Sequence, residues 1–238
     1  MIAANQLKGK KLKKINSFLE SLNAKEILEW VFCNLPNKQI SLTTSFQAGG
    51  IVLIDLCNKI GKKPPVFFVD TLYHFDETYE IAEKITTLYN VDLRVVRAAQ
   101  SRKKFELKYG AELWNRDVDY FHWLTKIKPL QKELSNYSTW ISARRRSQGA
   151  DRASLPCIEK TDWLKVNPLA RWSLKMALDY LNDKNIPYNR LHDQGYPSIG
   201  DKPLTVPSNS LEDERSGRWA GTGKTECGIH QYLERRNE

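Results

Sequence analysis

The most reactive chemistry in the sequence lies near its end, where RSGRWAGTGKTECGIH contains Cys227. Cations near a thiol stabilise the thiolate, which is the nucleophilic form of cysteine. The basic residues close to it in sequence are Arg215, Arg218, Lys224 and His230. Glu226 has the opposite effect on the thiol. Because several glycines surround the cysteine, the pattern predicts a nucleophile on a segment that moves as a lid.

Two other interpretations of Cys227 remain open at this point. It could be an ordinary exposed thiol, or it could form half of a metal site together with His230. The metal site lacks a second pair of ligands in the sequence. The exposed thiol is the stronger alternative if the segment is considered alone.

A small-residue loop, SFQAGG at 45–50, follows a β-rich run and precedes an apolar helical run. Backbone N–H groups at the start of a helix face anions, and Gly49 and Gly50 would let a phosphate or sulfate approach closely. The loop lacks the lysine of a P-loop and the spacing of a dinucleotide fingerprint. A plain strand-to-helix turn is therefore the alternative.

Two further groups of polar residues follow predicted strands. Asp70 and Thr71 follow VFFV, where Asp70 could accept hydrogen bonds from a ribose or an adenine amino group, while Asp76 and Thr78 could cap the next helix. ISARRRSQGADR contains Arg144, Arg145, Arg146 and Arg152. Guanidinium groups bind phosphate or sulfate oxygens in pairs. Because three consecutive arginines cannot point the same way, we expect one or two of them to be solvated.

Alternating β-rich and helical runs should position these groups. Strands are predicted at 40–44, 66–69, 93–96 and 139–142, with helices at 51–60 and 76–89 between the first three. This alternation predicts an α/β fold with a mostly parallel, twisted sheet and helices on both faces. Ligands bind such sheets at the carboxyl ends of the strands.

Flanking segments complete the prediction. Two amphipathic helices are expected within 14–34, with Asn23 as a cap between them, and Cys33 is expected to be buried on this stretch. Cys57 is expected in the core. Another helix is predicted in WSLKMALDYLND, and after Leu191 regular structure is hard to place. We therefore divide the chain into N-terminal helices (1–36), a nucleotide-binding α/β domain (37–200) and a mobile C-terminal tail (201–238).

Composition limits the classes of protein to which the chain can belong. With 238 residues and 41% hydrophobic content it can bury an ordinary core. No signal peptide or run of about 18 apolar residues is present, so a cytoplasmic protein with free thiols and no membrane partner is expected. The net charge of +9 favours a polyanionic partner, either a nucleotide or a nucleic acid.

Several motifs occur together in a consistent order over 41–232. They are TTSFQAGGIVLIDL, FFVDTLYHFDETY, the RRxQ of Arg145, Arg146 and Gln148, KVNPLARW, NIPYNRLHDQGYPSIGD and ERSGRWAGTGKTECGIH. In this combination the chain resembles the phosphoadenylyl-sulfate and adenylyl-sulfate reductases. ECGIH is the most specific part, because it matches the catalytic Glu-Cys-Gly-x-His of that family. The resemblance also implies a fold of the adenine-nucleotide alpha-hydrolase type, similar to ATP-pyrophosphatases.

The resemblance implies a mechanism and a set of site residues. Cys227 would attack the sulfur of the bound nucleotide to form an S-sulfocysteine, and a reduced thioredoxin or glutaredoxin would then release sulfite. His230 would be the second catalytic residue and would help to neutralise developing charge. The substrate-binding residues would be Ser45, Phe46, Gln47, Ala48, Gly49, Gly50, Asp70, Thr71, Lys126, Arg145, Arg146, Gln148, Arg215 and Arg218.

Two departures from the family pattern bear on the subclass. Where cluster-containing relatives have cysteine pairs, this chain has Phe121 and His122, then Asp201 and Leu204. We therefore expect no metal and no iron–sulfur cluster, and phosphoadenylyl sulfate is the favoured substrate. A cluster-free adenylyl-sulfate reductase is the alternative within the family.

Outside the family, a nucleic-acid-binding or tRNA-modifying protein and a non-catalytic nucleotide sensor are the alternatives. The ECGIH motif is unexpected on either view, so we expect no nucleic-acid partner. A homodimer is expected by analogy alone, since dimers are common among proteins of the family that the chain resembles.

Overall fold

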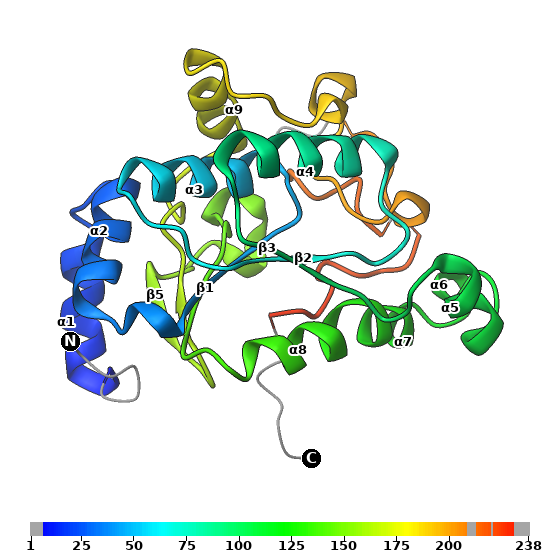
Figure 1. Cartoon of the computed structure of the whole chain (residues 1–238), viewed down its shortest axis with the longest axis horizontal. Coiled ribbons are helices and arrows are strands. Elements are labelled where there is room, and N and C mark those ends of the chain that lie inside the picture. The colour runs from blue at the N-terminus through cyan, green and yellow to red at the C-terminus, as the bar shows by residue number, and fades with distance from the viewer. Residues whose placement is uncertain (1–6, 209–212, 220, 231–238) are drawn as a thin grey trace.

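The computed structural model describes residues 7–208, 213–219 and 221–230. In this part of the chain a six-stranded sheet has the strand order β3-β2-β1-β4-β6-β5 (Figure 1). All neighbouring strands are parallel except β5 and β6, which are antiparallel. The strands are β1 (Ile40–Thr44), β2 (Val66–Val69), β3 (Leu93–Val96), β4 (Thr139–Ile141), β5 (Ile158–Lys160) and β6 (Leu164–Val166).

The predicted mostly parallel sheet is confirmed, and so are its first four strands. These strands were recognisable because apolar and β-branched residues fill runs that end at turn residues. β5 and β6 were not predicted from the sequence. Each has only three residues, and Lys165 interrupts the apolar pattern of β6.

Helices cover both faces of the sheet, as expected (Figure 1). On one face lie α3 (Ala48–Lys59), α4 (Asp76–Tyr89) and α9 (Leu174–Asp183). On the other face α8 (Lys128–Leu134) packs against β2 and β3. It ends a helical run that the sequence analysis missed: α5 (Arg102–Tyr109), α6 (Leu113–Arg116), α7 (Val118–His122) and a π-helical turn at Trp123–Ile127.

Several single-turn 3₁₀ helices join these elements. They are Asn37–Gln39, Arg146–Gln148, Ala150–Arg152, Arg190–Gln194 and Lys202–Leu204. No helix in the parts that the structure describes is long and apolar enough to cross a membrane.

The two N-terminal helices are confirmed as α1 (Gly9–Leu19) and α2 (Ala24–Asn34). Asn23 caps α2 in a capping box: its Oδ1 accepts a hydrogen bond from the Glu26 N–H at 3.1 Å, and Glu26 Oε2 accepts one from the Asn23 N–H at 2.7 Å. The burial expected for Cys33 is wrong, because its side chain is exposed. Position 33 lies off the stripe that buries Ile27, Leu28 and Val31.

The N-terminal helix α1 also meets the edge of the sheet. The side-chain amide of Asn16 donates to the Ile158 carbonyl at 2.6 Å and accepts from the Ile158 N–H at 2.9 Å. Ile158 belongs to the edge strand β5. An asparagine side chain thus makes the pair of hydrogen bonds that a neighbouring strand would make.

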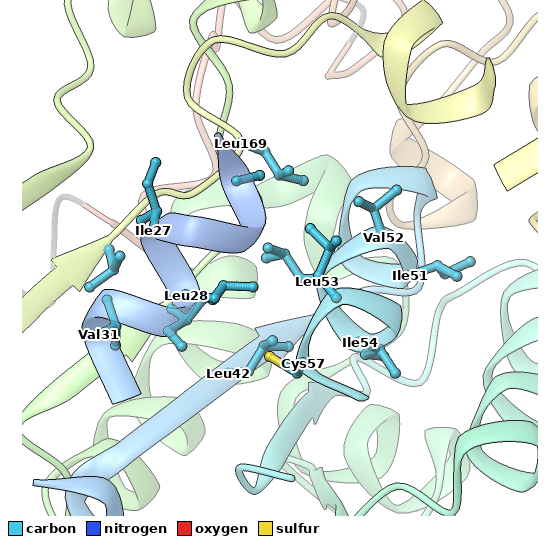
Figure 2. Packing of buried hydrophobic residues seen from close by; sticks show 14 of the residues in the cluster. Ile27, Leu28, Val31, Leu42, Ile51, Val52, Leu53, Ile54, Cys57 and Leu169 are labelled. Carbon is cyan, nitrogen blue, oxygen red and sulfur yellow. The ribbon is translucent and has the colours of Figure 1, made fainter. Parts of the chain in front are cut away.

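The main core lies between α2, α3 and the sheet (Figure 2). Leu28 of α2, Leu42 of β1 and Leu53 of α3 are fully buried there. Cys57 is buried as expected, and burial raises the pKa of its thiol to about 12. This cysteine therefore stays protonated and contributes to packing.

The described C-terminal residues, 201–208, 213–219 and 221–230, make several contacts with the body of the fold. Asp201 pairs with His74 in an isolated antiparallel bridge, and Thr205 pairs with Arg218 in another. Asp201 and Trp219 are buried. The expected mobility of the tail and the three-part division of the chain stay predictions. Residues 231–238, the end of that tail, lie outside the described residues.

Candidate active site

A cavity of about 200 Å³ opens at the carboxyl ends of β1, β2 and β4. β1 lies between β2 and β4, so the chain leaves it in one direction for β2 and returns on its other side as β4. This is the switch in strand order at which parallel α/β sheets bind ligands. The fold thus provides the site that the sequence pattern predicts.

The cavity is lined by most of the predicted site residues. They are Ser45, Gln47, Gly49, Gly50, Lys126, Arg145, Gln148, Arg215, Arg218, Cys227 and His230. They come from segments nearly 200 positions apart in the chain, and the fold brings them to one place. Phe46, Ala48, Asp70, Thr71 and Arg146 are not among the lining residues.

The loop at 45–50 is built for close approach. A Cβ atom on Gly50 would lie 2.2 Å from Thr44 Oγ1, and one on Gly49 would lie 3.1 Å from Arg145 Nη1. A side chain at position 50 would therefore displace Thr44, and one at position 49 would fit only tightly against Arg145. The predicted helix start at 51 is too late, because α3 includes both glycines in its first turn.

Gln47 joins this loop to the segment after residue 197. Its Nε2 donates to Ser45 Oγ at 3.0 Å, and its Oε1 accepts from the Ile199 N–H at 2.9 Å. The Ser45 hydroxyl accepts a hydrogen bond from Gln47, so its own proton is available to a ligand oxygen in the cavity.

Predicted site residues outside the cavity support its walls. Phe46 is buried and packs edge-on against Phe68. Ala48 donates its N–H to His192 Nε2 at 3.4 Å, which caps the start of α3. The Asp70 carboxylate accepts hydrogen bonds from Arg97 at 2.6 Å and Tyr79 at 2.7 Å, and the Thr71 hydroxyl donates to Asp201 at 2.6 Å. These contacts stabilise the loop after β2.

The three consecutive arginines point in different directions, and of the three Arg146 is partly solvated as expected, with its side chain 30% exposed. Each pairs with a glutamate from a different part of the chain: Arg144 with Glu159, Arg145 with Glu214 and Arg146 with Glu20. Arg146 also donates to the Leu155 carbonyl at 2.8 Å, which holds it outside the cavity. These glutamate partners are distant in sequence, so the local pattern gave no sign of them.

Glu226, the residue before the reactive cysteine, is held by two arginines. Arg152 donates to both of its carboxylate oxygens at 2.7 and 2.8 Å, and Arg215 also contacts both oxygens. Burial alone would raise the pKa of Glu226, but the hydrogen bonds from Arg152 and Arg215 outweigh it and lower the pKa to about 2. Glu226 is therefore ionised, and Cys227 lies next to a cluster of two guanidinium groups and one carboxylate, whose net charge is positive.

Lys126 enters the cavity from the π-helical turn and forms a buried ion pair. Its Nζ lies 2.5 Å from Asp201 Oδ2, and Asp201 is fully buried. His122 Nε2 lies 3.6 Å from the same oxygen. Burial would raise the pKa of Asp201, but the Lys126 charge and the His122 contact hold it well below its ordinary value. π-Helical turns often occur at functional sites, and here one carries a cation into the cavity.

Arg218 differs from the other cavity arginines. Among the described residues it has no carboxylate partner, and its Nη1 donates to Ser198 Oγ and to the Ile199 carbonyl, each at 3.2 Å. Burial lowers the pKa of Arg218 to about 10, so it stays charged at neutral pH. It can therefore offer charge-assisted hydrogen bonds to a ligand anion.

Gly200 leaves the space that Arg218 occupies. A Cβ atom at this position would lie 2.0 Å from Arg218 Nη2. We expect Gly200→Ala to displace the guanidinium and weaken nucleotide binding about 10-fold, because one charge-assisted contact is lost. Isothermal titration calorimetry would measure this with Arg218→Ala and the double variant as controls. If the two losses simply added in the double variant, the glycine would not act through Arg218.

His230 was expected to be a cation, and that expectation is wrong. Its ring stacks on Trp140 with centroids 4.6 Å apart and an interplanar angle of 16°. Burial, followed by the charges of Arg144 and Arg152, holds the pKa of His230 well below its ordinary value. The imidazole is therefore neutral at physiological pH, so it can exchange a proton but does not add a positive charge.

Comparison with known proteins shows the family of the chain. Residues 39–207 match the family model for the phosphoadenosine phosphosulfate reductase domain. The chain belongs to this family. Its sulfonucleotide reductases are oxidoreductases of sulfate reduction, and the matched region includes the loop at 45–50, Lys126 and the arginine cluster. The resemblance expected from the motifs is confirmed.

Some curated relatives of this reductase are named for the 3'-phosphorylated nucleotide and others for the unphosphorylated one. The chain is 39% identical to a probable phosphoadenosine phosphosulfate reductase of Schizosaccharomyces pombe, over 96% of this chain and 90% of that protein. It is 40% identical to adenosine 5'-phosphosulfate reductase 2 of Bacillus subtilis, over 87% of this chain and 89% of that protein. Sequence similarity therefore shows the family but does not distinguish the two substrates.

Solved structures agree on the fold. The phosphoadenylyl-sulfate reductase of Candida auris, in a phosphate complex, is 33% identical with a TM-score of 0.77 over 84% of this chain and 98% of that one. The FMN adenylyltransferase of Candida glabrata is 19% identical with a TM-score of 0.56 over 79% of this chain and 67% of that one, so it shows the fold alone. The expected adenine-nucleotide alpha-hydrolase-like fold of this reductase is confirmed.

The positions that would hold a cluster in some reductases are occupied by side chains unsuited to one. Phe121 and Leu204 lie together in an apolar cluster, and His122 and Asp201 are in the buried polar network around Lys126. None of these residues has a thiol, the usual ligand of an iron–sulfur cluster. No group of three or more potential metal ligands occurs within residues 7–208, 213–219 and 221–230.

Several residues that line the cavity of this reductase are not among the site residues that the family resemblance implied. They are Thr43, Thr44, Val69, His74, Trp140, Ser142, Ala143, Arg144, Arg152, Ser198, Ile199, Gly200, Trp219 and Ile229. Some had a signal, since Arg144 and Arg152 belong to the arginine cluster and residues 198–200 belong to the YPSIG motif. No sequence signal marked Trp140 as a site residue, because a tryptophan within a predicted strand is expected to be buried in the core.

Proposed function

We propose that this reductase converts phosphoadenylyl sulfate to sulfite and adenosine 3',5'-bisphosphate, with reduced thioredoxin or glutaredoxin as the electron donor and without an iron–sulfur cluster. The observation that carries the proposal is that Cys227 lines the same cavity as the glycine loop and the guanidinium group of Arg218. The cavity combines a nucleophile with donors for an anionic ligand. A cytoplasmic location and a homodimer stay predictions.

The first step is attack by the Cys227 thiolate on the sulfur of the nucleotide. A sulfur–sulfur bond forms, the bond from sulfur to the bridging phosphate oxygen breaks, and the nucleotide leaves with that electron pair. A donor thiolate then attacks Cys227 Sγ, and sulfite leaves with the electrons of the sulfur–sulfur bond. The second donor thiol resolves the mixed disulfide, so the donor becomes oxidised and Cys227 is restored.

Cavity residues would assist this transfer by offsetting charge. Arg218 and Lys126 are cations beside the cavity, and Ser45 has a hydroxyl proton to donate. Donors that are fixed before the reaction stabilise the charge that develops on the leaving oxygen. His230 would act here as a neutral proton carrier.

The proposal is tested by measuring sulfite release from each nucleotide with reduced thioredoxin. We expect kcat/KM to be about 100-fold or more higher for the 3'-phosphorylated nucleotide, since a site that pairs with a phosphate rejects an analogue without it. Elemental iron analysis of the purified protein is the accompanying control. A higher efficiency on the unphosphorylated nucleotide would contradict the substrate and favour the second candidate.

The second candidate is a cluster-free adenylyl-sulfate reductase. The observation in its favour is the name of several curated relatives, including the Bacillus subtilis protein at 40% identity. The same Cys227 chemistry would apply, and the released nucleotide would carry one phosphate fewer.

A further inference from the structure

Lys165 is a buried charge that the proposed chemistry does not use. It lies in the middle of β6 between Leu164 and Val166, and it is 1% exposed. It is not among the residues that line the cavity. A buried ammonium group is unfavourable unless other groups compensate for the lost water. Its contacts therefore indicate why a lysine occupies this position.

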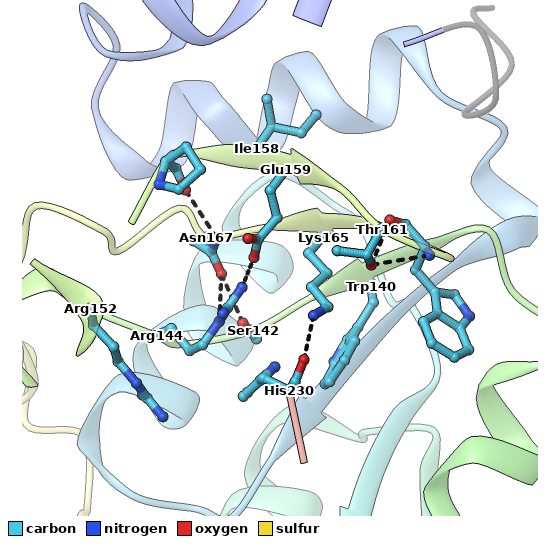
Figure 3. Close-up of polar contacts among 12 residues, drawn as sticks. Trp140, Ser142, Arg144, Arg152, Ile158, Glu159, Thr161, Lys165, Asn167 and His230 are labelled. Atoms are coloured by element: carbon cyan, nitrogen blue, oxygen red, sulfur yellow. Dashed lines mark hydrogen bonds and ion pairs between the residues drawn. The ribbon is translucent and has the colours of Figure 1, made fainter. Parts of the chain in front are cut away.

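The Lys165 ammonium group contacts the segment that carries the reactive cysteine. Its Nζ donates to the His230 backbone carbonyl at 2.9 Å (Figure 3). It also lies 5.4 Å from the centre of the Trp140 ring, at cation–π distance. The His230 ring stacks on the same Trp140 ring. Lys165 thus contacts both the His230 carbonyl and the Trp140 ring on which His230 stacks.

Trp140 is itself fixed in place. Its Nε1 donates to Thr43 Oγ1 at 2.7 Å, and Trp163 packs edge-on against it at 6.3 Å. Ile229 packs against the same apolar cluster. The platform beneath His230 is therefore rigid, because strands β1, β4 and the turn before β6 all contribute to it.

The ECGIH segment (residues 226–230) is anchored at both ends. At one end Arg152 and Arg215 hold the Glu226 carboxylate. At the other end Lys165 and Trp140 hold His230. Cys227 lies between these anchors, and a short chain fixed at two points has few conformations. The thiol is thereby kept at the wall of the cavity.

We propose that Lys165 is a positioning residue for the reaction: through the His230 carbonyl it holds the ECGIH segment so that Cys227 faces the bound nucleotide. The inference rests on the proposed function. Lys165 acts through the backbone of His230 and touches no substrate. Geometric placement of a nucleophile accounts for large rate factors, while ground-state binding is unaffected.

The test uses Lys165→Met in the full chain. In single-turnover experiments with phosphoadenylyl sulfate and no thiol, we expect S-sulfonation of Cys227 to slow by about 10- to 100-fold. The Kd for adenosine 3',5'-bisphosphate should change less than about 3-fold, because Lys165 is outside the cavity. Alkylation of Cys227 by iodoacetamide should become faster, since the segment loses one anchor. Mass spectrometry and calorimetry provide these measurements.

Lys160→Met is the matched control. Lys160 lies on the neighbouring strand β5 and also donates to backbone carbonyls, but to those of Thr161 and Asp162 in its own turn. It should leave all three measurements unchanged. Lys165→Arg, which keeps a buried cationic donor, should recover part of the sulfonation rate, and it replaces the methionine variant if that one does not fold.

The possible results distinguish a failure of the positioning role from a failure of the proposed function. Sulfonation at the wild-type rate in Lys165→Met, or equal losses of rate and nucleotide affinity, would overturn the positioning role. If the wild-type protein itself forms no adduct with either nucleotide, the proposed function fails instead. The alkylation rates of Cys227 still test the anchor in that case, because iodoacetamide needs no nucleotide.

Discussion

Changing Cys227 to serine is expected to reduce sulfite release by about 1000-fold or more and to abolish the S-sulfonate adduct. A serine hydroxyl is far less ionised and less nucleophilic than a thiol at neutral pH. The two buried cysteines cannot substitute for Cys227, since burial raises the pKa of Cys57 to about 12 and that of Cys157 to about 11. Their thiols stay protonated in a closed interior.

The measurement is sulfite release together with intact-protein mass after incubation with nucleotide. Cys33→Ser is the matched control, because Cys33 is an exposed thiol far from the cavity lining. It should behave as the wild-type protein. Adduct formation at the normal rate in Cys227→Ser would remove this residue from the mechanism.

Asp201→Asn is expected to lower the free energy of unfolding by about 3–5 kcal/mol, because it leaves the buried Lys126 charge without its partner. The pH dependence follows from the depressed pKa of Asp201. Its contribution to stability is present above its ordinary value of 3.8 and is lost as the pH falls toward its lower folded value. The difference between wild type and variant should therefore shrink in acid.

Urea unfolding at pH 7 and at pH 3 measures this difference. Asp201→Asn combined with Lys126→Met is the control, since removing both charges should recover part of the lost stability. Unfolding curves of the single variant that match the wild type at pH 7 would show that the pair contributes nothing. The single variant should also lose activity, because Lys126 lines the cavity.

The sequence predicts the parallel half of the fold well, because its elements are locally determined. Strands 66–69 and 93–96 and the helix 76–89 have the predicted bounds. The region from 102 to 134 was not predicted. Its helices are short, and they are stabilised by aromatic contacts such as Tyr73 with Trp114 at 4.9 Å, which join distant parts of the chain.

The sequence predicted which residues form the site better than it predicted their charge states and ion pairs. The motifs name Arg145, Arg215 and Cys227, all of which line the cavity. They do not reveal that Glu214 pairs with Arg145 or that Glu226 pairs with Arg215, since ion pairs depend on three-dimensional proximity. The charge state of His230 was not predicted either, because residues adjacent in sequence do not reveal that it is buried beside cations.

Asn16 has a consequence for how separate molecules interact. An edge strand with unpaired backbone groups is a template on which another chain can add a strand. The amide of Asn16 occupies both backbone groups of Ile158, so helix α1 shields the outer margin of β5. We therefore expect this contact to oppose the addition of a strand from another molecule at β5.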